Sequence, residues 1–120
     1  MVYFRSKLPI KSNKYHAKKI TIGDTTYDSK KEFKRAEYLE WLQKIKQISN
    51  LQKQVKFVLQ DPYVNNKGEK IRAITYIADF VYTQDGKTIA EDTKGFRTEV
   101  FNIKKKLFEK KYPDIDFRVF

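Results

Sequence analysis

The chain has 120 residues, of which 40% are hydrophobic and 34% charged, so one domain with a modest core and a densely charged surface is expected. Its 26 Lys and Arg residues against 15 Asp and Glu give a formal net charge of +11, which favours nucleic acid as partner, although an anionic membrane surface or simple solubility would also fit. Cysteine is absent and His16 is the single histidine, which excludes a disulfide framework and a zinc site built from several Cys or His side chains.

The N-terminal segment is strongly basic. Residues 1–23 contain no acidic side chain, and residues 1–19 are predicted to form an extended basic arm. Its cationic residues are Arg5, Lys7, Lys11, Lys14, Lys18 and Lys19. Both a nucleic-acid-binding arm and a solvated tail remain open. The sequence has neither a signal-peptide core nor an 18-residue apolar window, so we expect a cytoplasmic protein without a membrane partner.

The first half of the chain predicts a hairpin, a helix and a strand. Residues 20–27 indicate a short hairpin around Gly23-Asp24, and Ser29 to Glu32 has the capping-box pattern that begins a helix. A helix of about 20 residues, ending near Asn50, is expected from the spacing of its apolar side chains. That stripe, predicted to be core, consists of Tyr38, Trp41, Leu42, Ile45 and Ile48. A strand over 55–59 follows.

The second half predicts a loop, a hairpin, a helix and a strand. Residues 61–70 are expected to form a loop, because they contain Pro62 and the turn signal Asn66-Lys67-Gly68. Strands over 73–82 and 88–94 flank Asp85-Gly86, a favoured two-residue hairpin turn. A helix over 98–112, with Val100, Ile103 and Leu107 on its buried stripe, stops at Pro113, and residues 115–119 alternate as a final strand.

The hairpin carries the residues with the clearest chemistry. Counting back from a two-residue turn at Asp85-Gly86 places Asp79 opposite Asp92, with Cβ atoms roughly 5 Å apart. Two facing carboxylates repel each other, so either one stays protonated or a divalent cation lies between them. Side-chain alternation puts Ala90, Asp92 and Lys94 on one face of the returning strand. A lysine beside such a pair can orient a water molecule or stabilise charge on a phosphate.

Asp79, a hairpin, and then Asp92-Thr93-Lys94 resemble the signature of the PD-(D/E)xK nuclease superfamily. The expected order of elements over 29–120 is similar to the core of that restriction-endonuclease-like fold, which Holliday-junction resolvases also use. Tyr76-Ile77-Ala78-Asp79-Phe80 and Glu91-Asp92-Thr93-Lys94-Gly95 look like a small phage-borne branch. Ala78 stands where the motif name has proline, a departure that changes no chemistry.

The resemblance implies a role for individual residues. Asp79 and Asp92 would bind Mg²⁺ or Mn²⁺, Lys94 would be the catalytic lysine, and Glu32 would complete the site from the first helix. Glu32 is equally well explained as a helix-capping residue, since it follows Ser29 by three positions. Glu91 is a rival ligand to Asp92, but alternation points Glu91 away from Lys94. Candidate nucleic-acid contacts are Arg97, Thr98, Lys104 and Lys105, together with Lys18 and Lys19.

We therefore expect an α/β domain over residues 1–120, with a mixed sheet flanked by two helices and preceded by the basic arm. The expected function is a Mg²⁺- or Mn²⁺-dependent DNA endonuclease, a phosphodiester hydrolase encoded by a phage or prophage and linked to recombination or replication. A homodimer would suit cutting of two strands. The alternatives are a catalytically inactive nucleic-acid-binding module and a phage-encoded interaction protein.

Overall fold

The computed structural model describes residues 20–22, 25–27, 29–93 and 98–120. A hairpin of β1 (Ile20–Ile22) and β2 (Thr25–Tyr27) precedes α1 (Lys30–Lys44). The long strands β3 (Ser49–Gln60) and β6 (Ile74–Gln84) are joined by a small ladder of β4 (Tyr63–Val64) and β5 (Lys70–Ile71). The chain ends with β7 (Lys87–Asp92), α2 (Glu99–Lys111) and β8 (Ile115–Val119).

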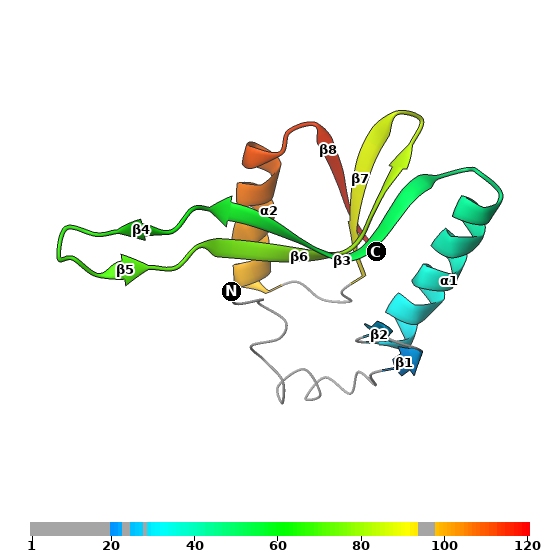
Figure 1. Ribbon diagram of the computed structural model, residues 1–120, viewed down its shortest axis with the longest axis horizontal. Helices are drawn as coiled ribbons and strands as arrows, with labels where there is room; N and C mark the ends of the chain where they lie inside the picture. Colours follow the sequence, from blue (N-terminus) through cyan, green and yellow to red (C-terminus); the bar gives the residue numbers. More distant parts are fainter. Residues whose placement is uncertain (1–19, 23–24, 28, 94–97) are drawn as a thin grey trace.

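The central sheet has four strands in the order β3-β6-β7-β8. The β3–β6 and β6–β7 pairs are antiparallel, whereas β7 and β8 run parallel. A parallel pair needs a crossover connection, and α2 provides it. Figure 1 shows α1 and α2 well apart, with the sheet between them, and the β4–β5 ladder projecting away from both helices. The expected α/β class, mixed sheet and two flanking helices are therefore confirmed.

The turn between β6 and β7 sets the register of the hairpin. Asp85 and Gly86 both have positive φ, 52° and 78°, as a two-residue hairpin turn requires. Gln84 then pairs with Lys87, and the same register runs back to Phe80 opposite Glu91. The predicted register is thus confirmed over these pairs, and the next position in it joins Asp79 to Asp92.

The first helix is shorter than expected and buries a different face. It ends at Lys44, because Lys46 takes a positive φ of 65°, and Asn50 lies in β3. Trp41 is 53% exposed, so the prediction that it is a core residue is wrong. The buried residues are Glu32, Ala36 and Leu39, which lie on one face of the helix. Tyr38 and Ile45 are exposed as well, whereas Leu42 and Ile48 of the predicted stripe do pack in the core between α1 and the sheet.

The second helix also differs in its buried stripe. Val100 and Ile103 are 48% and 58% exposed, whereas Phe101 and Phe108 are buried. Two Phe rings remove more apolar surface from water than Val and Ile would, so the helix turns its aromatic side inward. Thr98 caps the helix by accepting a hydrogen bond from the Phe101 amide.

Two separate clusters form the core. One lies between α1 and the sheet and includes Leu39, Phe80 and Ile89. The other lies between α2 and the sheet and includes Tyr76, Ala78, Ala90, Phe101 and Phe108. The expected loop over 61–70 is wrong in part, because it holds β4 and β5, which Asn65 stabilises by accepting from the amides of Lys67 and Glu69. Neither helix in the described part of the chain is long and apolar enough to span a bilayer.

Candidate functional site

Four carboxylates are buried among the residues that the structure describes. Glu32 is 1% exposed, and Asp79, Glu91 and Asp92 are each 0% exposed. They come from three elements, α1, β6 and β7, and all four were considered in the sequence, Glu91 as a rival ligand to Asp92. Burying a carboxylate is costly unless charged or hydrogen-bonding partners surround it. The partners of each group therefore indicate what it does.

The Asp79 carboxylate binds the end of the neighbouring strand. Its Oδ2 accepts one hydrogen bond from the Thr93 amide and one from Thr93 Oγ1, both at 2.8 Å. The Oδ2 of Asp92 accepts from the hydroxyl of Tyr76, a residue of the cluster beneath α2. The observed pairing of β6 with β7 ends at Phe80 and Glu91, and the two aspartates lie one position beyond it. Both side chains are thus fixed in orientation by the strand residues around them.

Glu91 has a structural role. Arg35 on α1 donates two hydrogen bonds to its carboxylate, at 2.8 and 2.7 Å, and the Tyr82 hydroxyl donates another. The hydrogen bonds to Glu91 raise the pKa of Arg35, and burial followed by the Glu91 contact raises the pKa of Tyr82. Glu91 therefore faces α1, whereas Asp92 faces the α2 side with Ala90, as side-chain alternation predicted.

Glu32 lies at the start of α1, but its side chain does not cap the helix. Its backbone amide donates to the Ser29 hydroxyl at 3.1 Å, so it does stand at the capped start of α1. Its carboxylate, however, points into the protein, where Oε2 accepts from Gln54 Nε2 at 2.6 Å. Gln54 lies on β3 at the register position facing Asp79. The spacing of Glu32 with Ala36 and Leu39 signalled this burial in the sequence, whereas nothing marked Gln54 beyond its place before the strand.

A row of polar side chains thus crosses the sheet. Gln54 and Asp79 lie between the Lys53–Phe80 and Val55–Ala78 pairs of β3 and β6, Asp79 and Asp92 lie one position beyond the Phe80–Glu91 pair, and Glu32 reaches Gln54 from α1. Carboxylate oxygens are the hard ligands that Mg²⁺ and Mn²⁺ prefer, so the donor chemistry fits such an ion. Within the described residues, however, no group of three or more His, Cys, Asp or Glu side chains is arranged to hold a metal ion.

The remaining predicted residues are only partly placed. Lys94, Arg97, Lys18 and Lys19 lie outside the described residues, as do His16 and the rest of the basic arm. Thr98 is the N-cap of α2.

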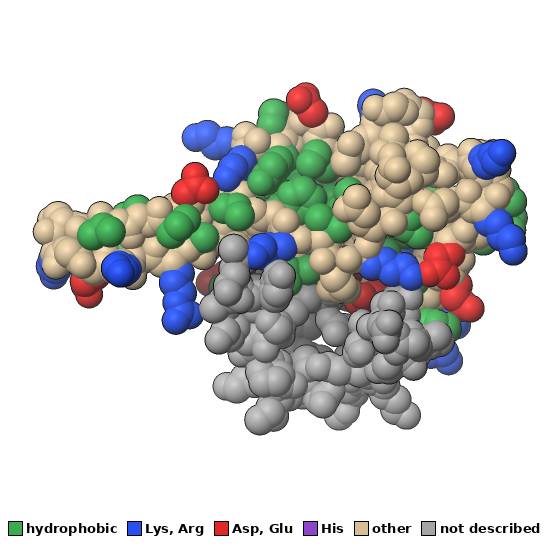
Figure 2. Space-filling view, viewed as in Figure 1, with side chains coloured by type: hydrophobic (Ala, Val, Ile, Leu, Met, Phe, Trp, Pro, Cys, Tyr) green, Lys and Arg blue, Asp and Glu red, His purple; other side chains and the backbone are tan. Residues whose placement is uncertain are grey.

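The two predicted lysines of α2 both have partners within the domain. Lys104 donates to the Thr75 carbonyl at 2.7 Å, and Lys105 forms an ion pair with Glu109. Figure 2 shows Lys and Arg side chains at several separate places on the viewed face of the described part, not in one patch.

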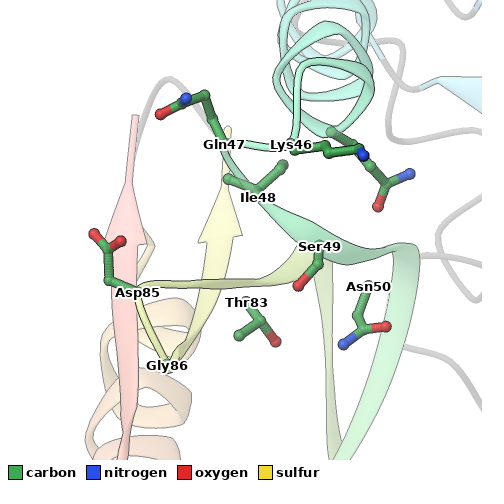
Figure 3. Close-up of a pocket in the computed structure, with 9 residues that line it drawn as sticks. Lys46, Gln47, Ile48, Ser49, Asn50, Thr83, Asp85 and Gly86 are labelled. Carbon is green, nitrogen blue, oxygen red and sulfur yellow. The ribbon is translucent and has the colours of Figure 1, made fainter.

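A surface pocket lies elsewhere, between the end of α1, the start of β3 and the β6–β7 turn (Figure 3). Its lining includes Lys46, Ser49, Asn50, Thr83 and Asp85, and none of the predicted site residues. Since it sits at the turn end of the β6–β7 hairpin and Asp79 and Asp92 at the other, the pocket is separate from the row of acids.

Comparison with known proteins places the chain in a family. No curated protein and no solved structure matches it. A family model does match, and it spans residues 12–119, which include the whole sheet and both helices. The chain belongs to that family, which is described as "Protein of unknown function (DUF1064)".

Proposed function

We propose that this protein is a metal-dependent nuclease that hydrolyses phosphodiester bonds in DNA, with Asp79 and Asp92 as metal ligands. The observation that carries the proposal is the pair of fully buried aspartates, which lie on β6 and β7 one position beyond the Phe80–Glu91 pair. A structural role alone would be served at lower cost by apolar residues, because buried carboxylates lose hydration that their neighbours must replace. A chain of net charge +11 also suits a phosphate backbone.

The residues have distinct parts in this proposal. Asp79 and Asp92 would hold Mg²⁺ or Mn²⁺, with Glu32 as a third carboxylate. Thr93 and Tyr76 orient the two aspartates through the hydrogen bonds that they donate. The ion would supply stabilisation of negative charge on the phosphate. Lys94, which follows Thr93 in the chain, is proposed to orient the attacking water molecule.

A test compares Asp92→Asn with the wild type on linear duplex, single-stranded and four-way-junction DNA, in Mn²⁺, in Mg²⁺ and in chelator. Asn keeps the shape of the side chain but removes its charge. Asp116→Asn is the matched control, because Asp116 lies on the adjacent strand β8 with its side chain 43% exposed. We expect metal-dependent cutting that falls by at least about 100-fold in Asp92→Asn and is unchanged in Asp116→Asn. Circular dichroism establishes that each variant is folded.

A second candidate is a nucleic-acid-binding module without catalysis. Two observations favour it: both aspartates are hydrogen-bonded within the domain, and no cluster of three acids that could hold a metal is found among the described residues. This alternative predicts DNA binding that weakens steeply with salt but no cutting in either metal. The absence of binding at physiological salt would contradict both candidates and leave an interaction protein.

A further inference from the structure

Strands β3 and β6 share a local irregularity at Gln54 and Asp79. The flanking pairs, Lys53 with Phe80 and Val55 with Ala78, keep one register. Between them Gln54 has a φ of 55°, in the left-handed region. Residues other than Gly, Asn and Asp rarely adopt this conformation, because the Cβ approaches the carbonyl oxygen too closely. No extra residue is inserted between these two pairs, although the register shifts elsewhere, between Ser49 and Gln52 and between Val58 and Gln60, so the feature at Gln54 is a change of backbone direction within a locally intact pairing.

Residues of β6 on either side of Asp79 pack in different core clusters. On β6, Tyr76 and Ala78 pack in the cluster beneath α2, whereas Phe80 and Tyr82 pack in the cluster beneath α1. Strict alternation would put all four on one face. On β3, Leu51 packs with the α1 cluster and Phe57 with the α2 cluster, but Leu51 lies within the register shift between Ser49 and Gln52. The change of buried face is therefore located on β6, between Ala78 and Phe80, next to Asp79.

The consequence for side chains is that Gln54 reaches α1. Its Nε2 donates to the Glu32 carboxylate at 2.6 Å, and Glu32 is buried. Irregular positions in sheets often re-aim a side chain next to a functional site, and a strained backbone persists where the surrounding structure holds it in place. Here the strained residue links a buried carboxylate of α1 to the strand position facing Asp79.

We propose that Gln54 is a positioning residue. Its left-handed backbone aims the side-chain amide at Glu32, and that hydrogen bond holds the Glu32 carboxylate at the row formed with Asp79 and Asp92. The inference rests on the proposed metal-dependent function for the identity of the bound ion. The arrangement of Gln54 and Glu32 itself stands on the hydrogen bond and the backbone geometry.

Two substitutions separate backbone strain from side-chain reach. Gln54→Gly relieves the strain and removes the amide. Gln54→Asn tolerates the left-handed backbone and keeps an amide, but its side chain is one methylene shorter. Lys46→Gly is the matched control, because Lys46 also has a positive φ, 65°, and lies at the end of α1 away from the acids.

Calorimetric titration with manganese chloride measures the effect on the ion. We expect Gln54→Gly and Gln54→Asn to bind Mn²⁺ about tenfold more weakly than the wild type, as is typical when a residue that orients a ligand is lost. Lys46→Gly should bind as the wild type does. Lys46→Gly should melt at the same or a higher temperature in chelator, because strain is relieved, whereas Gln54→Gly should melt lower than Lys46→Gly, because it also loses the hydrogen bond to the buried Glu32 carboxylate. Equal Mn²⁺ affinity in the wild type and both Gln54 variants would overturn the proposal.

A second measurement needs neither metal nor activity. Urea unfolding in chelator of Gln54→Asn, Glu32→Gln and the double variant gives the coupling between the two positions. We expect a coupling of about fivefold in the unfolding equilibrium constant, because the pair shares a charge-assisted hydrogen bond. Coupling without Mn²⁺ binding by the wild type would uphold the positioning of Glu32 and refute the metal-dependent function. Additive effects would overturn the positioning role whatever the metal does.

Discussion

Replacing Arg35 with Ala tests whether Glu91 is a structural anchor. The substitution removes two hydrogen bonds, at 2.8 and 2.7 Å, from a carboxylate that is 0% exposed, and leaves only the Tyr82 hydroxyl among the three donors described. Removing one partner of a buried ion pair typically costs about 3–5 kcal/mol. The Arg35 guanidinium also lies 4.1 Å from the Phe120 ring centroid, a contact of about 0.5–1 kcal/mol at a partly exposed site.

We therefore expect Arg35→Ala to lower the free energy of unfolding by about 3–5 kcal/mol, a large share of the about 5–15 kcal/mol of an ordinary domain. The reverse change should cost less. In Glu91→Gln, the Arg35 side chain is 23% exposed and can still be hydrated. In Arg35→Ala, the Glu91 carboxylate loses its charged partner and has no access to water.

Urea denaturation followed by circular dichroism measures both single variants and the double variant. The reasoning predicts that Arg35→Ala is the more destabilising single change and that the double variant is more stable than the sum of the two losses implies. A loss below about 1 kcal/mol in Arg35→Ala would refute it, because that is the range of an exposed ion pair.

Two further predictions concern α1 and Tyr82. Trp41→Ser should change the free energy of unfolding by less than about 0.5 kcal/mol, because the Trp41 side chain is exposed. Leu39→Ala should cost about 2–5 kcal/mol, because Leu39 is fully buried. Similar losses in the two variants, measured by urea unfolding, would contradict the observed orientation of α1. Burial and the Glu91 contact raise the pKa of Tyr82 in the folded protein, so its phenol ionises first in the unfolded chain and stability should fall as pH rises above about 10. The decrease in stability with pH should be smaller in Tyr82→Phe than in the wild type. An equal decrease of the urea midpoint in both proteins across this pH range would exclude the effect.

Sequence alone determined the features that depend on neighbouring residues. Asp85-Gly86 specifies a turn in which both residues have positive φ. That turn fixes the register of the hairpin, which extended by one position brings Asp79 opposite Asp92. The capped starts of α1 at Ser29 and of α2 at Thr98 follow from local hydrogen bonding in the same way.

Tertiary structure decided which faces are buried and where the sheet changes direction. Helical spacing predicted Trp41 to be a core residue, but spacing defines a stripe without saying which stripe packs against the sheet. Ala36 and Leu39 pack there instead, and Glu32 lies on the same face of the helix. The left-handed backbone of Gln54 is invisible in the sequence, because glutamine has no local preference for it. It exists because the packing of α1 and α2 against β3 and β6 outweighs a local cost, and that packing brings the Glu32 carboxylate to the Gln54 amide.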